Sequence, residues 1–103
     1  LILLMPGSRL MEIKKMLQGA IKYADEYEIK VWAWQDGETT WAEVIALVDG
    51  EWDTDNCHTF TYLETAEPTV EQTKQMFADM KKLATYLKKH FENVTLEKEI
   101  QWV

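Results

Sequence analysis

The sequence predicts an α+β domain in which a mostly antiparallel sheet of four strands carries two helices on one face. Two apolar stripes at helical spacing mark the helices, one before residue 25 and one after residue 69. Between them lie three runs rich in β-branched and aromatic residues, and a fourth alternating run follows the second helix. We therefore expect the order helix, strand, strand, strand, helix, strand in a single domain over residues 1–103. Leu1–Met5 is a candidate for a short extra strand at the N-terminus.

The first helix is predicted to follow Pro6-Gly7, which interrupts the chain, with Ser8 as its N-cap. Its apolar stripe consists of Leu10, Ile13, Leu17, Ala20, Ile21 and Ala24. Asp25 and Glu26 are unfavourable at the negative end of the helix dipole, so we expect the helix to fray there.

A β-hairpin is predicted from the segments 29–35 and 38–48, joined by a two-residue turn at Asp36-Gly37. The facing pairs would be Gln35 with Glu38, Trp32 with Trp41, Lys30 with Glu43 and Ile29 with Val44. An indole pair and an opposite-charge pair in one register favour this hairpin.

The segment 40–50 also fits a helix. Thr40 and Glu43 match a capping box, and the apolar residues that follow are helically spaced up to Gly50. The β-branched content, the turn and both cross-strand pairs favour the strand.

The boundaries of the remaining elements are marked by loop and capping residues. Residues 49–56 are predicted to form a polar, acidic loop, and residues 57–64 alternate Thr with aromatic residues as a strand does. Thr69 and Gln72 form a capping box at the start of a long helix. Its stripe consists of Thr73, Met76, Phe77, Met80, Leu83, Ala84, Leu87 and Phe91. Residues 94–103 are predicted to form the last strand, with Val94, Leu96, Ile100 and Trp102 on one face.

Alternation along the hairpin separates two kinds of side chain onto the two faces of the sheet. One face carries the aliphatic residues Ile29, Val31, Ala33, Ala42, Val44, Ala46 and Val48. The other carries Lys30, Trp32, Trp34, Trp41, Glu43, Ile45 and Leu47. Small residues let helices pack closely, so we expect the helices on the aliphatic face and the indoles exposed to a ligand or a second subunit. The alternative is that the second helix or Trp102 covers the indoles.

Charge is unevenly distributed along the chain, whose net charge is −7. The block from Val31 to Thr73 has no Lys or Arg, but it holds ten carboxylates and four of the five tryptophans. The rest of the chain, with 11 basic and 8 acidic residues, carries +3. Carboxylates beside exposed indoles suit a cation or a basic protein surface, not a phosphate backbone, so no nucleic-acid partner is expected.

The order helix, three strands, helix is similar to that of the double-stranded-RNA-binding domain in topology only. That family places basic residues at the start of its last helix, where this chain has Glu67 and Glu71. We therefore carry no RNA-binding function over, and we assign the lysines of the long helix to a solvated face.

No catalytic residue and no metal site is predicted. Asp53 and Glu64 have the spacing of the first and last ligands of a calcium loop, but His58 stands where that loop requires glycine. Cys57 and His58 are neighbours on a strand, so their side chains point to opposite faces and cannot pair. No nucleophile elbow or phosphate-binding glycine loop is present. An acid–base pair of carboxylates, such as Glu43 with Glu64, is the least favoured alternative.

The single cysteine and the lack of any apolar run near 20 residues favour a cytoplasmic protein without a membrane partner. Leu1–Met5 is too short for a signal peptide. We expect a non-catalytic binding protein without a cofactor, which forms homodimers and binds a cationic or aromatic small molecule. The expected ligand or interface residues are Trp32, Trp34, Trp41, Glu43, Ile45 and Leu47. The alternative is an acidic inhibitor or immunity-type protein that docks on a basic enzyme surface.

Overall fold

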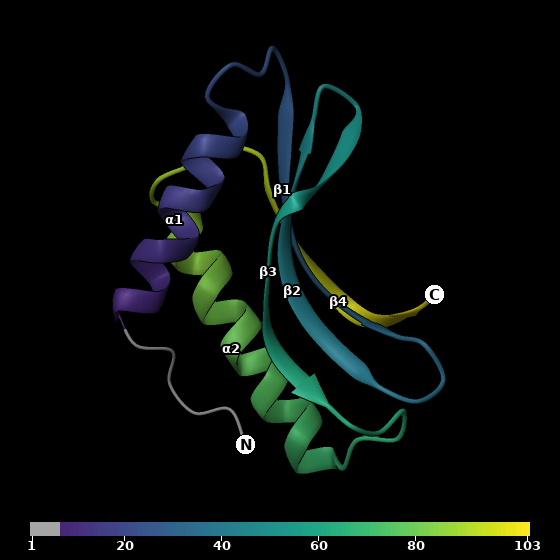
Figure 1. The fold of residues 1–103 in the computed structure, drawn as a ribbon. Coiled ribbons are helices and arrows are strands. Elements are labelled where there is room, and N and C mark those ends of the chain that lie inside the picture. The colour runs from purple at the N-terminus through teal and green to yellow at the C-terminus, as the bar shows by residue number, and fades with distance from the viewer. Residues whose placement is uncertain (1–6) are drawn as a thin grey trace.

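The computed structural model describes residues 7–103, so the possible strand at Leu1–Met5 lies outside the described residues. Helix α1 (Gly7–Ile21) is followed by strands β1 (Tyr27–Gln35), β2 (Thr40–Val48) and β3 (Glu51–Leu63), helix α2 (Val70–Lys88) and strand β4 (Val94–Trp102). The predicted α+β class and element order are confirmed (Figure 1). The helical alternative for residues 40–50 is wrong.

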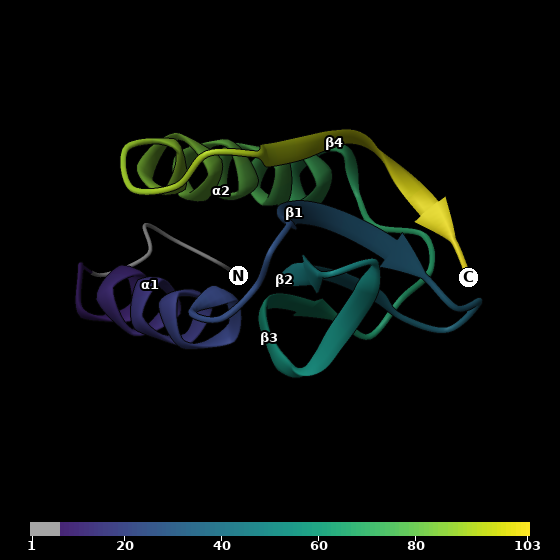
Figure 2. The same cartoon turned by 90° about the horizontal axis from the view of Figure 1, so that it is seen from above.

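The strands form one sheet in the order β3-β2-β1-β4. The pairs β1–β2 and β2–β3 are antiparallel, whereas β1–β4 is parallel because α2 returns the chain to the edge beside β1. Both helices pack on one face: α1 lies over β2 and β3, and α2 lies over β1 and β4 (Figure 2). No helix in residues 7–103 covers the opposite face, which we call the open face; it is the concave side of the curved sheet (Figure 1).

The core lies between the sheet and the two helices. The predicted aliphatic face is fully buried there at Ile29, Val31, Ala33, Ala42, Val44 and Ala46. The helices contribute Ile13, Leu17, Met76, Met80, Leu83 and Leu87. The alanines let the helices approach the sheet closely. Val48, predicted on the same face, is only partly buried because it lies at the end of β2.

Of the three features predicted at the helix ends, two are observed and one is not. At the start of α2, Thr69 Oγ1 accepts a hydrogen bond from the Gln72 amide (3.1 Å), and Gln72 Oε1 accepts one from the Thr69 amide (2.9 Å), so the capping box is confirmed. Helix α1 ends at Ile21, before Asp25. Ser8 lies within α1, so its predicted role as N-cap is wrong.

The β1–β2 hairpin forms, but its turn contains four residues, 36–39, instead of two. Asp36 Oδ1 accepts hydrogen bonds from the amides of Glu38 (3.0 Å) and Thr39 (2.9 Å) and from the Thr39 hydroxyl (2.8 Å). These bonds, led by the one from Glu38, hold the pKa of Asp36 below its ordinary value. The aspartate side chain thus stabilises a longer turn than the Asp-Gly pair alone predicts.

The longer turn shifts the register by two residues. The predicted pairs Gln35–Glu38, Trp32–Trp41, Lys30–Glu43 and Ile29–Val44 are therefore wrong. The observed pairs are Gln35–Thr40, Trp34–Trp41, Trp32–Glu43, Lys30–Ile45 and Ile29–Ala46. Side chains alternate with a period of two, so this shift leaves each one on its predicted face.

The second Asp-Gly pair forms the tight turn. Asp49 and Gly50 have φ angles of 51° and 86°, as a two-residue type I′ turn requires, and Val48 pairs directly with Glu51. Residues 51–56 belong to β3, so the predicted loop at 49–56 is wrong. Its acidic side chains instead lie along an edge strand.

Strand β3 bends at two bulges, where its register against β2 shifts. One lies at Phe60, and the other spans residues 53–56, where Asn56 Nδ2 donates to Asp53 Oδ2 (2.8 Å). Bulges increase the local bend and twist of a strand. The β2–β3 end of the sheet therefore curves toward the open side (Figure 1).

Asp79 is a buried carboxylate in α2. Its side chain is 2% exposed, Oδ1 accepts a hydrogen bond from Gln75 Nε2 (3.2 Å), and Oδ2 has no partner among the described residues. Burial raises the pKa of Asp79 above its ordinary value. The ionised form therefore opposes folding at neutral pH.

We expect Asp79→Asn to raise the free energy of unfolding at pH 7 by about 1 kcal/mol, because a neutral amide costs less to bury than a carboxylate. Because the pKa of Asp79 is raised, the native carboxylate becomes protonated as pH falls through its folded-state pKa toward 3.8, and the stability that its charge costs the native protein is then regained. Urea unfolding of both proteins over that range should show the difference shrinking. A variant that is less stable than the native protein at pH 7 would contradict this account.

Candidate functional site

The open face brings together the six residues predicted to bind a ligand or a second subunit. They are Trp32 and Trp34 of β1 with Trp41, Glu43, Ile45 and Leu47 of β2. All are partly exposed except Ile45, which is 6% exposed. The alternative in which α2 or Trp102 covers the indoles is wrong. Helix α2 packs on the other face, and Trp102, which pairs with Gln35, is itself 72% exposed.

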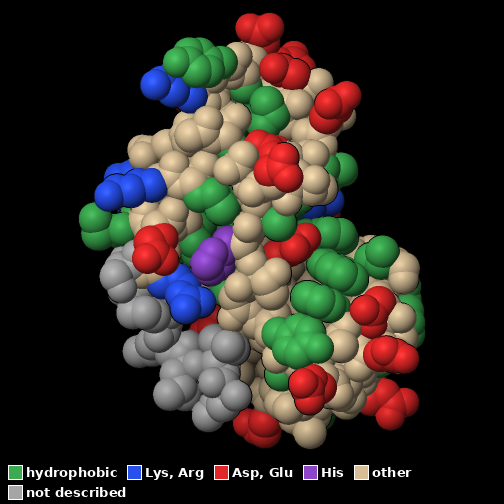
Figure 3. Space-filling view, in the orientation of Figure 1, with side chains coloured by type: hydrophobic (Ala, Val, Ile, Leu, Met, Phe, Trp, Pro, Cys, Tyr) green, Lys and Arg blue, Asp and Glu red, His purple; other side chains and the backbone are tan. Residues whose placement is uncertain are grey.

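Four rings form a continuous row across three strands; we call Trp32, Trp34, Trp41 and Tyr62 the aromatic row. Trp34 and Trp41 are stacked, with centroids 5.0 Å apart and planes at 5°. Trp32 adjoins Trp34 at 6.3 Å, and Tyr62 of β3 meets Trp41 edge-on at 4.9 Å. Each such pair contributes about 0.5–1.5 kcal/mol beyond its buried area. Hydrophobic side chains gather beside acidic ones on the side of the sheet away from the helices (Figure 3).

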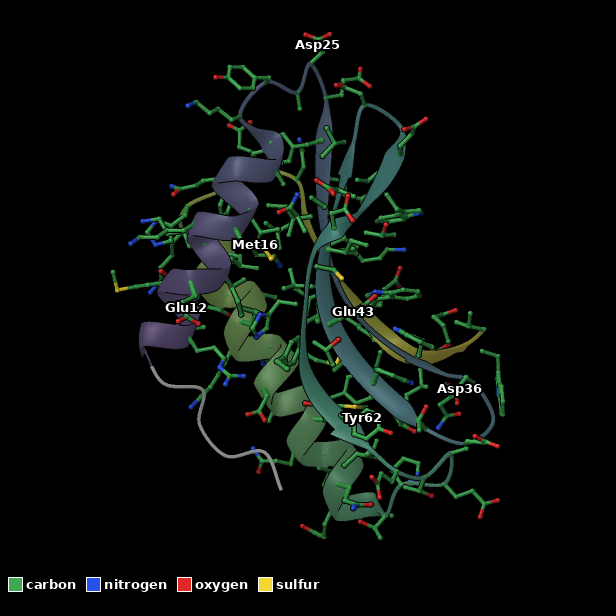
Figure 4. All side chains as sticks on the ribbon, in the orientation of Figure 1. Glu12, Met16, Asp25, Asp36, Glu43 and Tyr62 are labelled. Atoms are coloured by element: carbon green, nitrogen blue, oxygen red, sulfur yellow. The ribbon has the colours of Figure 1, made fainter. Side chains whose placement is uncertain are left out.

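Hydrogen bonds fix two of the indoles. Trp32 Nε1 donates to Glu43 Oε1 (3.0 Å), and Trp41 Nε1 donates to Thr39 Oγ1 (2.6 Å). Trp34 Nε1 is buried and has no acceptor in the described part of the chain. Glu43 lies on the side of the sheet away from the helices (Figure 4). The row is thus oriented before any ligand arrives, and Glu43 places a negative charge within it.

Lys30 places a cation on this face. Its Nζ lies 5.6 Å from the ring centroid of Trp32 and 5.3 Å from that of Trp52. Glu97 Oε1 of β4 lies 3.1 Å from the same nitrogen. Each cation–π contact contributes about 0.5–1 kcal/mol at a partly exposed position, and the exposed ion pair adds little. Two indoles and one carboxylate therefore hold an ammonium group on the open face.

Four residues of this surface were not predicted as site residues: Lys30, which was only placed on this face, and Tyr62, Trp52 and Glu97. Trp52 was assigned to the predicted loop at 49–56, whereas it lies in strand β3 and pairs with Leu47. Glu97 alternates onto the polar side of the last strand. However, only the parallel pairing of β4 with β1 brings it to Lys30, and no local sequence signal specifies that pairing.

Cys57 and His58 lie on opposite faces, as alternation predicts. Cys57 pairs with Ile45 on the open face, whereas His58 pairs with Val44 on the helix-covered face. Burial and then the nearby Glu43 carboxylate raise the pKa of the Cys57 thiol. A protonated thiol is a weak nucleophile, so this cysteine suits a structural role.

His58 lies where β3 packs against α1, and its Nε2 is buried without a partner among the described residues. Burial, followed by Arg9 of α1, lowers the pKa of His58 from its ordinary 6.5. Glu12, which also lies on α1 (Figure 4), acts in the opposite direction. A lowered pKa disfavours protonation in the folded state. The native protein therefore keeps the full stability that neutral His58 allows above pH 6.5, and it loses free energy of unfolding as pH falls from 6.5 toward the lower folded-state pKa.

We expect His58→Gln to lose less stability than the native protein between pH 7 and pH 5, because the variant has no imidazole to protonate at this position. Thermal unfolding at the two pH values measures the difference. His90→Gln, at an exposed position, is the matched control and should behave like the native protein. Equal pH sensitivity of native protein and His58→Gln would show that His58 is not the titrating group.

Comparisons with known proteins find no matching family model, no matching curated protein and no matching solved structure. Within residues 7–103, no group of three or more His, Cys, Asp or Glu side chains is placed to hold a metal ion. Neither helix in that range has the length and apolar character needed to cross a membrane.

Proposed function

We propose that this chain is a non-catalytic binding protein whose open face binds a cationic or aromatic small molecule. The observation that carries the proposal is the aromatic row, which remains partly exposed on a face that no described helix covers. A stacked and hydrogen-bonded row needs little reorganisation to receive a ring or a cation, so less free energy is lost on binding. Glu43 would supply the counter-charge for a cation.

The proposal includes homodimer formation and a cytoplasmic location. A partly exposed aromatic surface is typical of interaction sites, and a second copy would cover part of it and leave the rest open to the small molecule. The single cysteine of the chain suits a reducing compartment. Sedimentation at tens of micromolar measures the oligomeric state, and a strict monomer would remove the homodimer from the proposal.

Tryptophan fluorescence tests the binding function, because three of the five indoles belong to the aromatic row. We expect a saturable change in emission with benzyltrimethylammonium, an aromatic cation, at up to about 10 mM. A wider set of organic cations and neutral aromatic compounds would define the preference. The absence of a saturable response to any of them would contradict the proposal.

An acidic inhibitor that docks on a basic enzyme surface is the second candidate. Asp49 Oδ1 accepts hydrogen bonds from the amides of Asp25 and Glu26 (2.9 Å each), which gathers acidic residues of two connections at one end of the molecule (Figure 4). Two hollows of about 200 and 260 Å³ are lined in part by Glu26, Glu28, Glu51, Asp53 and Asp55. Such a surface favours fast, salt-sensitive association with a basic protein. Recovery of only its own subunits from a low-salt pull-down would count against this candidate.

A further inference from the structure

We propose that Trp32, Trp52 and Glu97 form a cage for the protonated amino group of a primary alkylamine, and that Lys30 fills this cage until the amine displaces it. The inference rests on the proposed function, because the cage is part of the open face, and it specifies the class of cation that the face binds. It also gives the open face two adjacent parts, the cage and the stacked pair of Trp34 and Trp41.

The cage is assembled by three strands that are distant in the sequence. Trp32 comes from β1, Trp52 from the bulged strand β3 and Glu97 from β4. The Lys30 ammonium lies within 5.6 Å of both ring centroids and 3.1 Å from the Glu97 carboxylate. The hydrogen bond from Trp32 Nε1 to Glu43 (3.0 Å) orients one wall independently of Lys30. This wall would therefore remain in place when another ammonium group replaces that of Lys30.

The present occupant identifies the ligand class. Lys30 places a primary ammonium group on a flexible four-carbon stem between the two indoles, where the ring faces attract the charge and Glu97 accepts an N–H hydrogen. A quaternary ammonium has no N–H to donate to Glu97. A guanidinium is planar and presents its donors in a rigid fork. A primary alkylammonium reproduces both interactions of Lys30.

Displacement of Lys30 is feasible because the cage is open to solvent. Trp52 is 45% exposed, and the side chains of Lys30 and Glu97 are 22% and 32% exposed. An ion pair at this exposure is weak, and the lysine regains rotamer freedom when it leaves. The net charge of −7 also raises the local concentration of cations.

Calorimetric titration with n-butylammonium chloride tests the proposal, because this ion carries the same four-carbon stem and ammonium group as the lysine side chain. In Lys30→Ala the tethered competitor is absent, so we expect n-butylammonium to bind at least about tenfold more tightly than to the native protein. Lys30→Gln, which is also uncharged, should show the same direction of change. Lys98→Ala removes the same charge from an exposed position of β4 and should bind like the native protein. Neutral 1-butanol should not bind to any of these proteins.

Loss of one wall provides the decisive comparison. Trp52→Ala in the Lys30→Ala background should abolish the gain in affinity. Circular dichroism first establishes that each variant is folded. If the native protein and both Lys30 variants then bind n-butylammonium with equal affinity, the cage is overturned. Benzyltrimethylammonium titrated into the same proteins separates the two proposals, since Trp34 and Trp41 are unchanged in all of them. If it binds and n-butylammonium does not, the cage alone fails; if neither binds, the proposed function fails as well.

Discussion

Replacing Leu83 by alanine should lower the free energy of unfolding by about 2–5 kcal/mol. Leu83 is fully buried in α2 and belongs to the core between the helices and the sheet. The substitution removes apolar contacts and leaves a cavity that close-packed neighbours fill only in part. A domain of this size has about 5–15 kcal/mol of stability in total, so the variant should lose a large part of it.

Thr85→Ala is the matched control, because Thr85 lies on the exposed side of the same helix. Alanine is the better helix former, and a surface substitution usually changes stability by no more than about 0.5 kcal/mol. Urea unfolding followed by circular dichroism measures both variants. A Leu83→Ala loss as small as the Thr85→Ala effect would mean that α2 does not pack on the aliphatic face.

Replacing Trp41 by alanine should weaken the binding of benzyltrimethylammonium by at least about tenfold, or about 1.4 kcal/mol. Trp41 stacks on Trp34 and meets Tyr62, so its removal divides the aromatic row at its centre. The expected loss lies within the range for one stacking or cation–π contact. Trp41 is partly exposed, so Trp41→Ala should cost less stability than Leu83→Ala.

Two further variants make the binding result specific. Trp41→Phe retains a smaller ring and should bind with intermediate affinity. Trp102→Ala removes an indole at the far end of β4 that is 72% exposed, and it should leave the affinity unchanged. A folded Trp41→Ala protein with native affinity would exclude the aromatic row as the binding surface.

The two faces of the sheet could be predicted because they depend only on alternation. A register error of two residues changed every facing pair in the β1–β2 hairpin but moved no side chain to the other face. The turn itself could not be predicted from the Asp-Gly pair, which occurs at 36–37 and again at 49–50. The Asp36 side chain bonds to Thr39 and stabilises a four-residue turn, whereas Asp49 adopts a positive φ and allows the two-residue turn.

The candidate site was only partly predictable, because sequence alternation reports local strand pairing and not the pairing of distant strands. The indoles of β1 and β2 follow from a local hairpin, and local pairing is what sequence alternation reports. The cage around Lys30 requires a bulged edge strand and a parallel strand from the end of the chain. Both are set by packing over the whole sheet, so no local sequence signal places Trp52 and Glu97 beside Lys30.

The central claim is that a ligand binds to the aromatic row on the open face. NMR of the five indole N–H groups during a titration with benzyltrimethylammonium tests it most directly. We expect the signals of Trp32, Trp34 and Trp41 to move in a saturable way while that of Trp102 stays in place. Movement of the Trp102 signal alone, or of no indole signal, would contradict the claim.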